Sequence, residues 1–296
     1  MAVAVVTDST QYLPRELIAA QGIDVVSLYV KRGESLERES ELLDDLAGYY
    51  GRLREASDLP TTSQPSVGDF LACYEPLLQA GHDIVSLHLS SAVSGTFDSA
   101  RQAQRQLEEG ASQARIEVID SRTTCGGLGL QVLAAADCAR RGASLAVVAD
   151  HARRARDGLR IWFSVDSLEF LRRGGRIGGA QAWIGGALKI KPILSLESEV
   201  TPVERVRTAG RAFERMVEYM RELHDAGADV WCVQHIQSPD KAQQLVERGR
   251  EIFGCDPIFV SEVGPVVGAY AGPGMIGVGG MHSSAMAAPP VAAGGD

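Results

Sequence analysis

The feature that most constrains the fold is a repeated order in which a short apolar run ends in a polar loop and a helix follows. Residues 2–6, 84–89 and 116–119 are such runs, rich in Val, Ile and Leu. The loops that follow them, 7–10, 90–96 and 120–121, are rich in Ser, Thr and Asp. Strands that alternate with helices need crossover connections, so the first half predicts an α/β unit with a mainly parallel sheet.

The second half predicts a different sheet. Residues 192–196 and 200–206 are apolar runs separated only by the polar turn 197–199, which indicates an antiparallel hairpin. We therefore predict an N-terminal α/β domain over residues 1–157 and a mixed-sheet α/β domain over 158–281. Residues 282–296 consist largely of Ala, Pro and Gly and predict a disordered tail.

Two further segments of the first half have patterns that predict their secondary structure. Residues 23–30 predict one strand, and residues 61–66 predict a polar connection before a helix through Phe70.

The composition excludes several classes of protein. The 296 residues carry a formal charge of −9, so bulk charge disfavours binding to nucleic acid. The five cysteines never form a Cys-x-x-Cys pair, which argues against a disulfide framework or a zinc site and favours a reducing compartment. No apolar stretch approaches a membrane span, and the N-terminus lacks a signal pattern, so we expect a cytoplasmic protein without stable membrane insertion.

The polar loops are the first candidate site. Because ligands bind at the carboxyl ends of parallel strands, the three loops are expected to converge. Ser94 or Thr96 would then lie at a helix N-terminus, where free N–H groups favour an anion. Each hydroxyl alone is more simply a helix cap. The loop with Ser90, Ser91, Ser94 and Thr96 has more hydroxyls than one cap needs, and Gly95 allows a ligand to approach the backbone.

A second candidate is the glycine-rich segment 171–179, which carries Arg172, Arg173 and Arg176. Guanidinium groups clamp carboxylates and phosphates, but a solvated connection between helices fits the spacing equally well. Residues 272–277 match a dinucleotide fingerprint but have no helix after them inside a βαβ unit. No base accompanies the hydroxyls in the sequence, and this favours binding over catalysis.

Several segments together resemble the DegV family of bacterial fatty-acid-binding proteins. They occur in family order over residues 3 to about 280. The most specific are Thr62-Ser63-Gln64-Pro65-Ser66, Ser94-Gly95-Thr96 and Arg173-Gly174-Gly175-Arg176-Ile177.

The resemblance implies a two-domain DegV-like fold that holds one long-chain fatty acid, such as palmitate or oleate, between its domains. It implies a carrier without cofactor or metal, which is not itself an enzyme and which presents the acid to a separate ATP-dependent fatty acid kinase subunit. Tyr270 stands where the family usually has histidine. The fatty-acid-binding residues carried over are Thr62, Ser63, Ser91, Ser94, Gly95, Thr96, Arg173, Arg176 and Tyr270.

The course of the acyl chain is less defined by the sequence. Glycines gather at 174–186 and 264–280, and we interpret both clusters as walls of a lipid site. Candidate lining residues, each of which fits ordinary core packing better when taken singly, are Phe70, Leu71, Phe97, Phe163, Ile184, Ile193 and Met275.

Two alternatives stay open at this point. One is a small-molecule kinase or phosphotransferase of the related dihydroxyacetone-kinase architecture, with Asp8, Asp120 and Arg176 as substrate contacts. The other is a purely structural or regulatory role.

Overall fold

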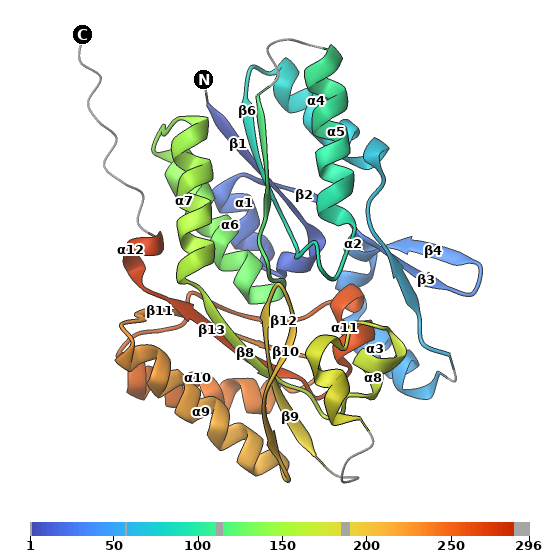
Figure 1. Cartoon of the computed structure of the whole chain (residues 1–296), viewed down its shortest axis with the longest axis vertical. Coiled ribbons are helices and arrows are strands. Elements are labelled where there is room, and N and C mark those ends of the chain that lie inside the picture. Colours follow the sequence, from blue (N-terminus) through green and yellow to red (C-terminus); the bar gives the residue numbers. More distant parts are fainter. Residues whose placement is uncertain (1, 57, 111–114, 185–189, 287–296) are drawn as a thin grey trace.

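A computed structural model describes residues 2–56, 58–110, 115–184 and 190–286, and it contains three sheets (Figure 1). The first has the order β2-β1-β6-β7 and is parallel throughout. The second has the order β10-β9-β8-β13-β11-β12 and is mixed. The third is a small antiparallel sheet, β4-β3-β5.

The strands have the following bounds: β1 Val3–Asp8, β2 Ile23–Val26, β3 Tyr29–Arg32, β4 Ser35–Arg38, β5 Thr61–Ser63, β6 Asp83–His88, β7 Ile116–Asp120, β8 Arg160–Ser164, β9 Lys191–Glu197, β10 Glu199–Val206, β11 Val230–His235, β12 Phe259–Glu262 and β13 Ile276–Met281. The helices are α1 Arg15–Gln21, α2 Glu39–Leu42, α3 Leu46–Glu55, α4 Val67–Gln79, α5 Thr96–Gly110, α6 Cys125–Arg140, α7 Leu145–Gly158, α8 Glu169–Arg173, α9 Ala209–Asp225, α10 Pro239–Phe253, α11 Pro265–Ala271 and α12 Ser283–Met286.

Helix α6 forms the central layer of the molecule. It packs against β1 of the parallel sheet and against β11 and β13 of the mixed sheet, so it is buried between them. Its second residue, Gly126, has to be small, because an added Cβ would lie 2.7 Å from Sγ of Cys232 on β11. Helices α4 and α5 cover the other face of the parallel sheet, and α9 and α10 cover the other face of the mixed sheet.

The mixed sheet confirms the predicted hairpin. Strands β9 and β10 pair antiparallel around the turn at Ser198, with Val200 opposite Leu196. All strands of the parallel sheet lie before residue 158, and all strands of the mixed sheet lie after it.

The prediction of one strand over 23–30 is wrong. The chain leaves the parallel sheet after Val26, and Tyr29 begins β3 in the small sheet. Leu28 between them pairs with neither strand: its N–H donates to Oγ of Ser9 and its carbonyl accepts from N–H of Glu39. These bonds turn the chain, and β5 at 61–63, predicted as a connection, completes the small sheet.

The predicted tail begins with an ordered turn. Ser283–Met286 forms α12, which packs on α6 and α7, and Ser283 donates its hydroxyl to Asp229 at 2.7 Å. Residues 287–296 lie outside the described residues. No helix within the described ranges is long and apolar enough to cross a membrane.

Candidate functional site

A pocket lies between the mixed sheet and the elements that cover it, α6, α11 and the loops at the carboxyl ends of β2 and β6. It encloses about 1060 Å³ of space, including open solvent at its mouth. Its walls are mostly apolar and buried, for example Leu89, Leu171 and Val266.

The floor of the pocket is one face of the mixed sheet. A row of laterally paired residues crosses it: Cys232 lies opposite Gly279, Gly279 opposite Ile161, and Leu196 opposite Val200. A second row, two residues along each strand, contains Gln234, Gly277 and Phe163. The two rows face the same side because side chains alternate along a strand.

Two glycines make this floor flat. A Cβ added at Gly277 would lie 3.4 Å from Cβ of Phe163, and one at Gly279 would lie 3.5 Å from Sγ of Cys232. Both are ordinary van der Waals contacts, so packing within the sheet does not require glycine at either place. The missing side chains instead leave space above the sheet for a ligand.

The mouth of the pocket carries its accessible polar groups. Thr62 on β5 and Tyr270 on α11 come from distant parts of the sequence, and their hydroxyl oxygens lie 2.5 Å apart. The guanidinium of Arg176 lies over the Tyr270 ring, 5.0 Å from its centroid. Gly174 permits this arrangement, because a Cβ there would lie 2.2 Å from Cδ1 of Tyr270.

Ser94 joins the mouth from the loop before α5. Its hydroxyl lies 2.9 Å from that of Thr96, the first residue of the helix. Arg176 reaches the same loop by donating from Nε to the carbonyl oxygen of Val93, at 3.3 Å. Helix α5 therefore begins beside two hydroxyls and a cation, a setting that favours an anion.

Four of the sequence-predicted site residues thus line one pocket: Thr62, Ser94, Arg176 and Tyr270. Thr96 is buried behind Ser94, and Gly95 lies against the amide of Gln64. The others do not line the pocket. Ser63 is exposed, the Ser91 hydroxyl donates to Asp120 at 2.6 Å, and Arg173 is exposed on α8.

The predicted lining of the acyl chain needs correction. Phe163 and Met275 line the pocket. Ile193 instead faces α9 and α10, because it alternates with Leu194 along β9. Ile184 is exposed. Phe70, Leu71 and Phe97 belong to the core between the parallel sheet and its outer helices. Of the glycine clusters, residues 185 and 186 lie outside the described residues.

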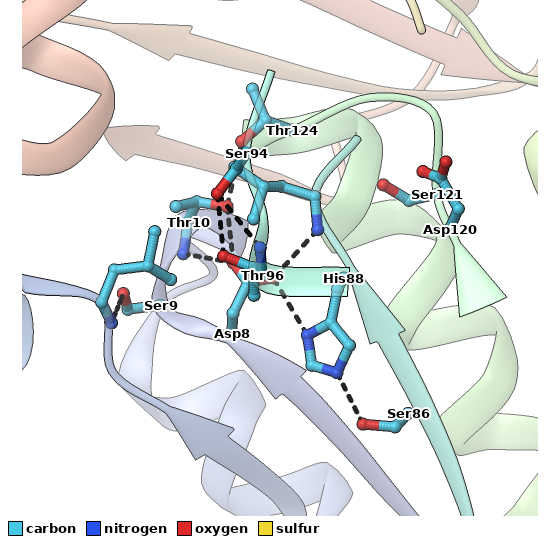
Figure 2. Close-up of polar contacts among 12 residues, drawn as sticks. Asp8, Ser9, Thr10, Ser86, His88, Ser94, Thr96, Asp120, Ser121 and Thr124 are labelled. Atoms are coloured by element: carbon cyan, nitrogen blue, oxygen red, sulfur yellow. Dashed lines mark hydrogen bonds and ion pairs between the residues drawn. The ribbon is translucent and has the colours of Figure 1, made fainter. Parts of the chain in front are cut away.

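Below the mouth, a buried carboxylate fixes the ends of two strands (Figure 2). Asp8 ends β1 and is fully buried. One of its oxygens accepts from N–H and Oγ of Thr10, at 3.0 and 2.6 Å. The other accepts from N–H of Leu89 at 2.9 Å and lies 3.1 Å from Nδ1 of His88. The loop that carries Ser94 starts directly after this anchor.

The same network extends in both directions from Asp8. On one side His88 Nε2 lies 2.7 Å from Oγ of Ser86, which also accepts from the hydroxyl of Tyr74. On the other side Thr10 accepts from Thr124 at the pocket wall, at 3.0 Å. The Asp, His and Ser are arranged like a hydrolase triad, but the buried Ser86 hydroxyl does not line the pocket, so it has no access to a substrate there.

The predicted convergence of the three polar loops is confirmed, because Asp8 of the first loop accepts from N–H of Leu89, directly before the second loop, and Ser91 of the second loop donates to Asp120 of the third. For the phosphotransferase alternative, however, the three named residues do not meet. Arg176 lines the pocket, whereas Asp8 and Asp120 do not. In Figure 2 Asp120 lies to one side of the Asp8 network.

Glu39, a buried residue on α2 that holds α11 in place, was not predicted from the sequence. Its carboxylate accepts from N–H of Val266 at 2.7 Å, from the hydroxyl of Tyr12 at 2.7 Å and from Oγ of Ser9 at 2.5 Å. Helix α11 supplies Val266 and Tyr270 to the pocket. No motif surrounds Glu39, and only its position among apolar residues of the fold identifies it.

Glu39 is expected to make stability depend on pH. Burial raises the pKa of its carboxyl group from 4.5 to about 7, against the opposing effect of its hydrogen bonds. Because the folded state favours the protonated form, protonation of Glu39 adds to the free energy of unfolding. This contribution is complete below pH 4.5 and is lost as pH rises to about 7. The loss is expected to be of the order of 3 kcal/mol. Urea unfolding at pH 5 and pH 8 should show this loss of unfolding free energy in the wild type and not in Glu39→Gln. If the unfolding free energies of the two proteins changed equally with pH, the role of Glu39 would be contradicted.

Comparisons with known proteins agree with this architecture. Residues 2–282 match the model of the family described as "Uncharacterised protein, DegV family". A DegV domain-containing protein of Streptomyces coelicolor is 39% identical over 281 residues, which cover 93% of this chain and 97% of that protein.

Solved structures with similar folds include two from this family. DegV of Bacillus subtilis, described as a fatty acid binding protein, has a TM-score of 0.84 and 33% identity, with 95% of this chain and 99% of that chain covered. A DegV family protein of Thermus thermophilus, described by its fatty acid binding, has a TM-score of 0.82 and 33% identity, with 95% and 100% covered. This chain therefore belongs to the DegV family.

Proposed function

We propose that this protein binds one long-chain fatty acid, with its carboxylate at the mouth of the pocket and its acyl chain over the mixed sheet. The observation that carries the proposal is the distribution of polarity in the pocket. Thr62, Ser94, Arg176 and Tyr270 lie at the accessible end, and the inner end is buried and largely apolar. The fatty acid binding described for the Bacillus subtilis and Thermus thermophilus proteins supports the same ligand class.

The inner polar groups do not compete for this ligand, because they already have partners. The Gln234 side chain accepts from N–H of Gly126 and donates to Oγ of Ser261 at 2.9 Å. The Thr124 hydroxyl is used by Thr10. An acyl chain therefore meets apolar walls and polar groups that mostly have hydrogen-bond partners already. Such surroundings suit a ligand segment without hydrogen-bonding groups.

The affinity is expected to come mainly from the acyl chain. Each buried methylene contributes ~0.8 kcal/mol, so about fifteen of them contribute ~12 kcal/mol before the cost of ordering the ligand. The carboxylate then needs only moderate binding. Hydroxyl donors and one partly engaged guanidinium at the start of α5 supply it.

We assign the protein a carrier role on the same basis. The carboxylate would stay at the mouth, where Arg176 is exposed, and a separate ATP-dependent kinase subunit would convert it there. Acid-loaded protein should form no acyl phosphate with ATP alone. Formation of acyl phosphate without a second protein would contradict this role.

If the carboxylate binds at the mouth, removal of the Thr62 or the Ser94 hydroxyl should lower the affinity for the fatty acid. Thr62→Val and Ser94→Ala should each weaken palmitate binding by about tenfold or more, because each removes a donor to a charged group. Isothermal titration of delipidated protein measures this. Ser63→Ala is the matched control, since the Ser63 hydroxyl is exposed and donates only to the carbonyl of Gln64. Equal affinity in all three variants would remove this carboxylate site.

A further inference from the structure

The pocket shares two of its lining side chains with a second cavity. The second cavity encloses about 690 Å³, open solvent included, and lies beside the start of β8 and the turn between β9 and β10. Ile161 and Leu196 line both cavities.

The pairing of the strands places these two side chains side by side. Trp162 lies opposite Ser195 in the antiparallel pair of β8 and β9, and the next position along this register brings Ile161 opposite Leu196. Both are buried and continue the row of Gly279 and Val200 across the sheet. The row therefore changes from a glycine, which leaves space, to two branched side chains, which fill it.

The two cavities differ in chemistry. The pocket on one side of the pair is largely apolar, whereas the second cavity is lined by Arg122, Arg156 and Arg160 together with Asp157 and Glu197. A methylene that passed the pair would enter a charged and partly open space. It would gain little from burial there, and the displaced side chains would lose their packing.

We propose that Ile161 and Leu196 form the end wall of the acyl-chain path and so set the longest fatty acid that the protein accepts. This inference rests on the proposed function, because it assumes an acyl chain that runs inward from the mouth. The wall acts by packing alone: an acid that is too long must displace Leu196 or Ile161 or lift its carboxylate from the mouth.

A series of saturated acids from lauric to behenic acid tests the wall. In the wild type, affinity should rise about fourfold with each methylene until the chain meets the wall, and then fall. In Leu196→Ala, the first acid beyond the wild-type maximum should bind about tenfold more tightly than in the wild type, because overpacking is relieved. Leu196→Phe should move the maximum to shorter acids.

Leu194→Ala is the matched control. Leu194 lies two residues earlier on the same strand and is also buried, but it lines neither cavity. Its truncation should lower stability similarly and leave the preferred chain length unchanged. Ile161→Val and Leu196→Val provide milder variants if Leu196→Ala does not fold.

The outcomes separate the two proposals. If the wild type binds no acid of any length, the proposed function fails. If the wild type and Leu196→Ala bind with the same preferred length, the wall proposal fails and the proposed function stands. If Leu194→Ala changed the preferred acyl-chain length as much as Leu196→Ala does, the wall proposal would also fail.

Discussion

Gly277→Leu is expected to abolish binding of long-chain fatty acids while leaving the protein folded. Gly277 is the second residue of β13 and lies on the face that forms the pocket floor. The new Cβ would make only ordinary contacts, the nearest at 3.4 Å from Phe163, and leucine suits an extended strand better than glycine does. The rest of the side chain would occupy the space assigned to the ligand.

The loss should exceed about one hundredfold in affinity, since displacing four methylenes forfeits about 3 kcal/mol. Titration with palmitate measures it, and urea unfolding checks the fold. Gly277→Ala adds only the Cβ and should weaken binding far less. Wild-type affinity in Gly277→Leu would show that the acyl chain does not lie over β13.

Asp8→Ala is expected to destabilise the protein by about 4 kcal/mol, because the buried donors of Thr10, Leu89 and His88 would lose their acceptor. The damage would include the end of β6, from which the loop to Ser94 begins. Urea unfolding at neutral pH measures the change.

Asp120→Ala is the control for Asp8→Ala. Asp120 also caps a loop, where it accepts from Ser91 and from N–H of Arg122, but its bonds lie in an exposed place. Water can replace the lost acceptor there, so the effect should be about 1 kcal/mol or less. Equal destabilisation by the two substitutions would contradict the anchoring role of Asp8.

Local patterns in the sequence were sufficient for much of the architecture. The apolar runs that end in polar loops predicted the parallel sheet and the meeting of its loops, and the turn at 197–199 predicted the hairpin. Three sequence motifs predicted residues at the mouth of the pocket, namely Thr62, Ser94 and Arg176. Each of these signals lies within a few neighbouring residues.

The remaining features depend on pairs that are distant in the sequence. Strand β13 lies between β8 and β11, so the row that joins Ile161 to Gly279 follows from register and not from spacing. Glu39 accepts from N–H of Val266 on α11, 227 residues later in the chain. The chain turns at Leu28 because Ser9 and Glu39 bond its backbone. No local pattern contains such information.

Mass spectrometry of the protein purified without detergent tests whether the pocket holds one long-chain fatty acid. Native spectra should show one added mass of a long-chain acid per chain, and denaturing extraction should release that acid. Delipidated protein should take up one equivalent of palmitate or oleate. A chain that carries no acid after purification and takes up neither palmitate nor oleate would show that this pocket is not a fatty acid site.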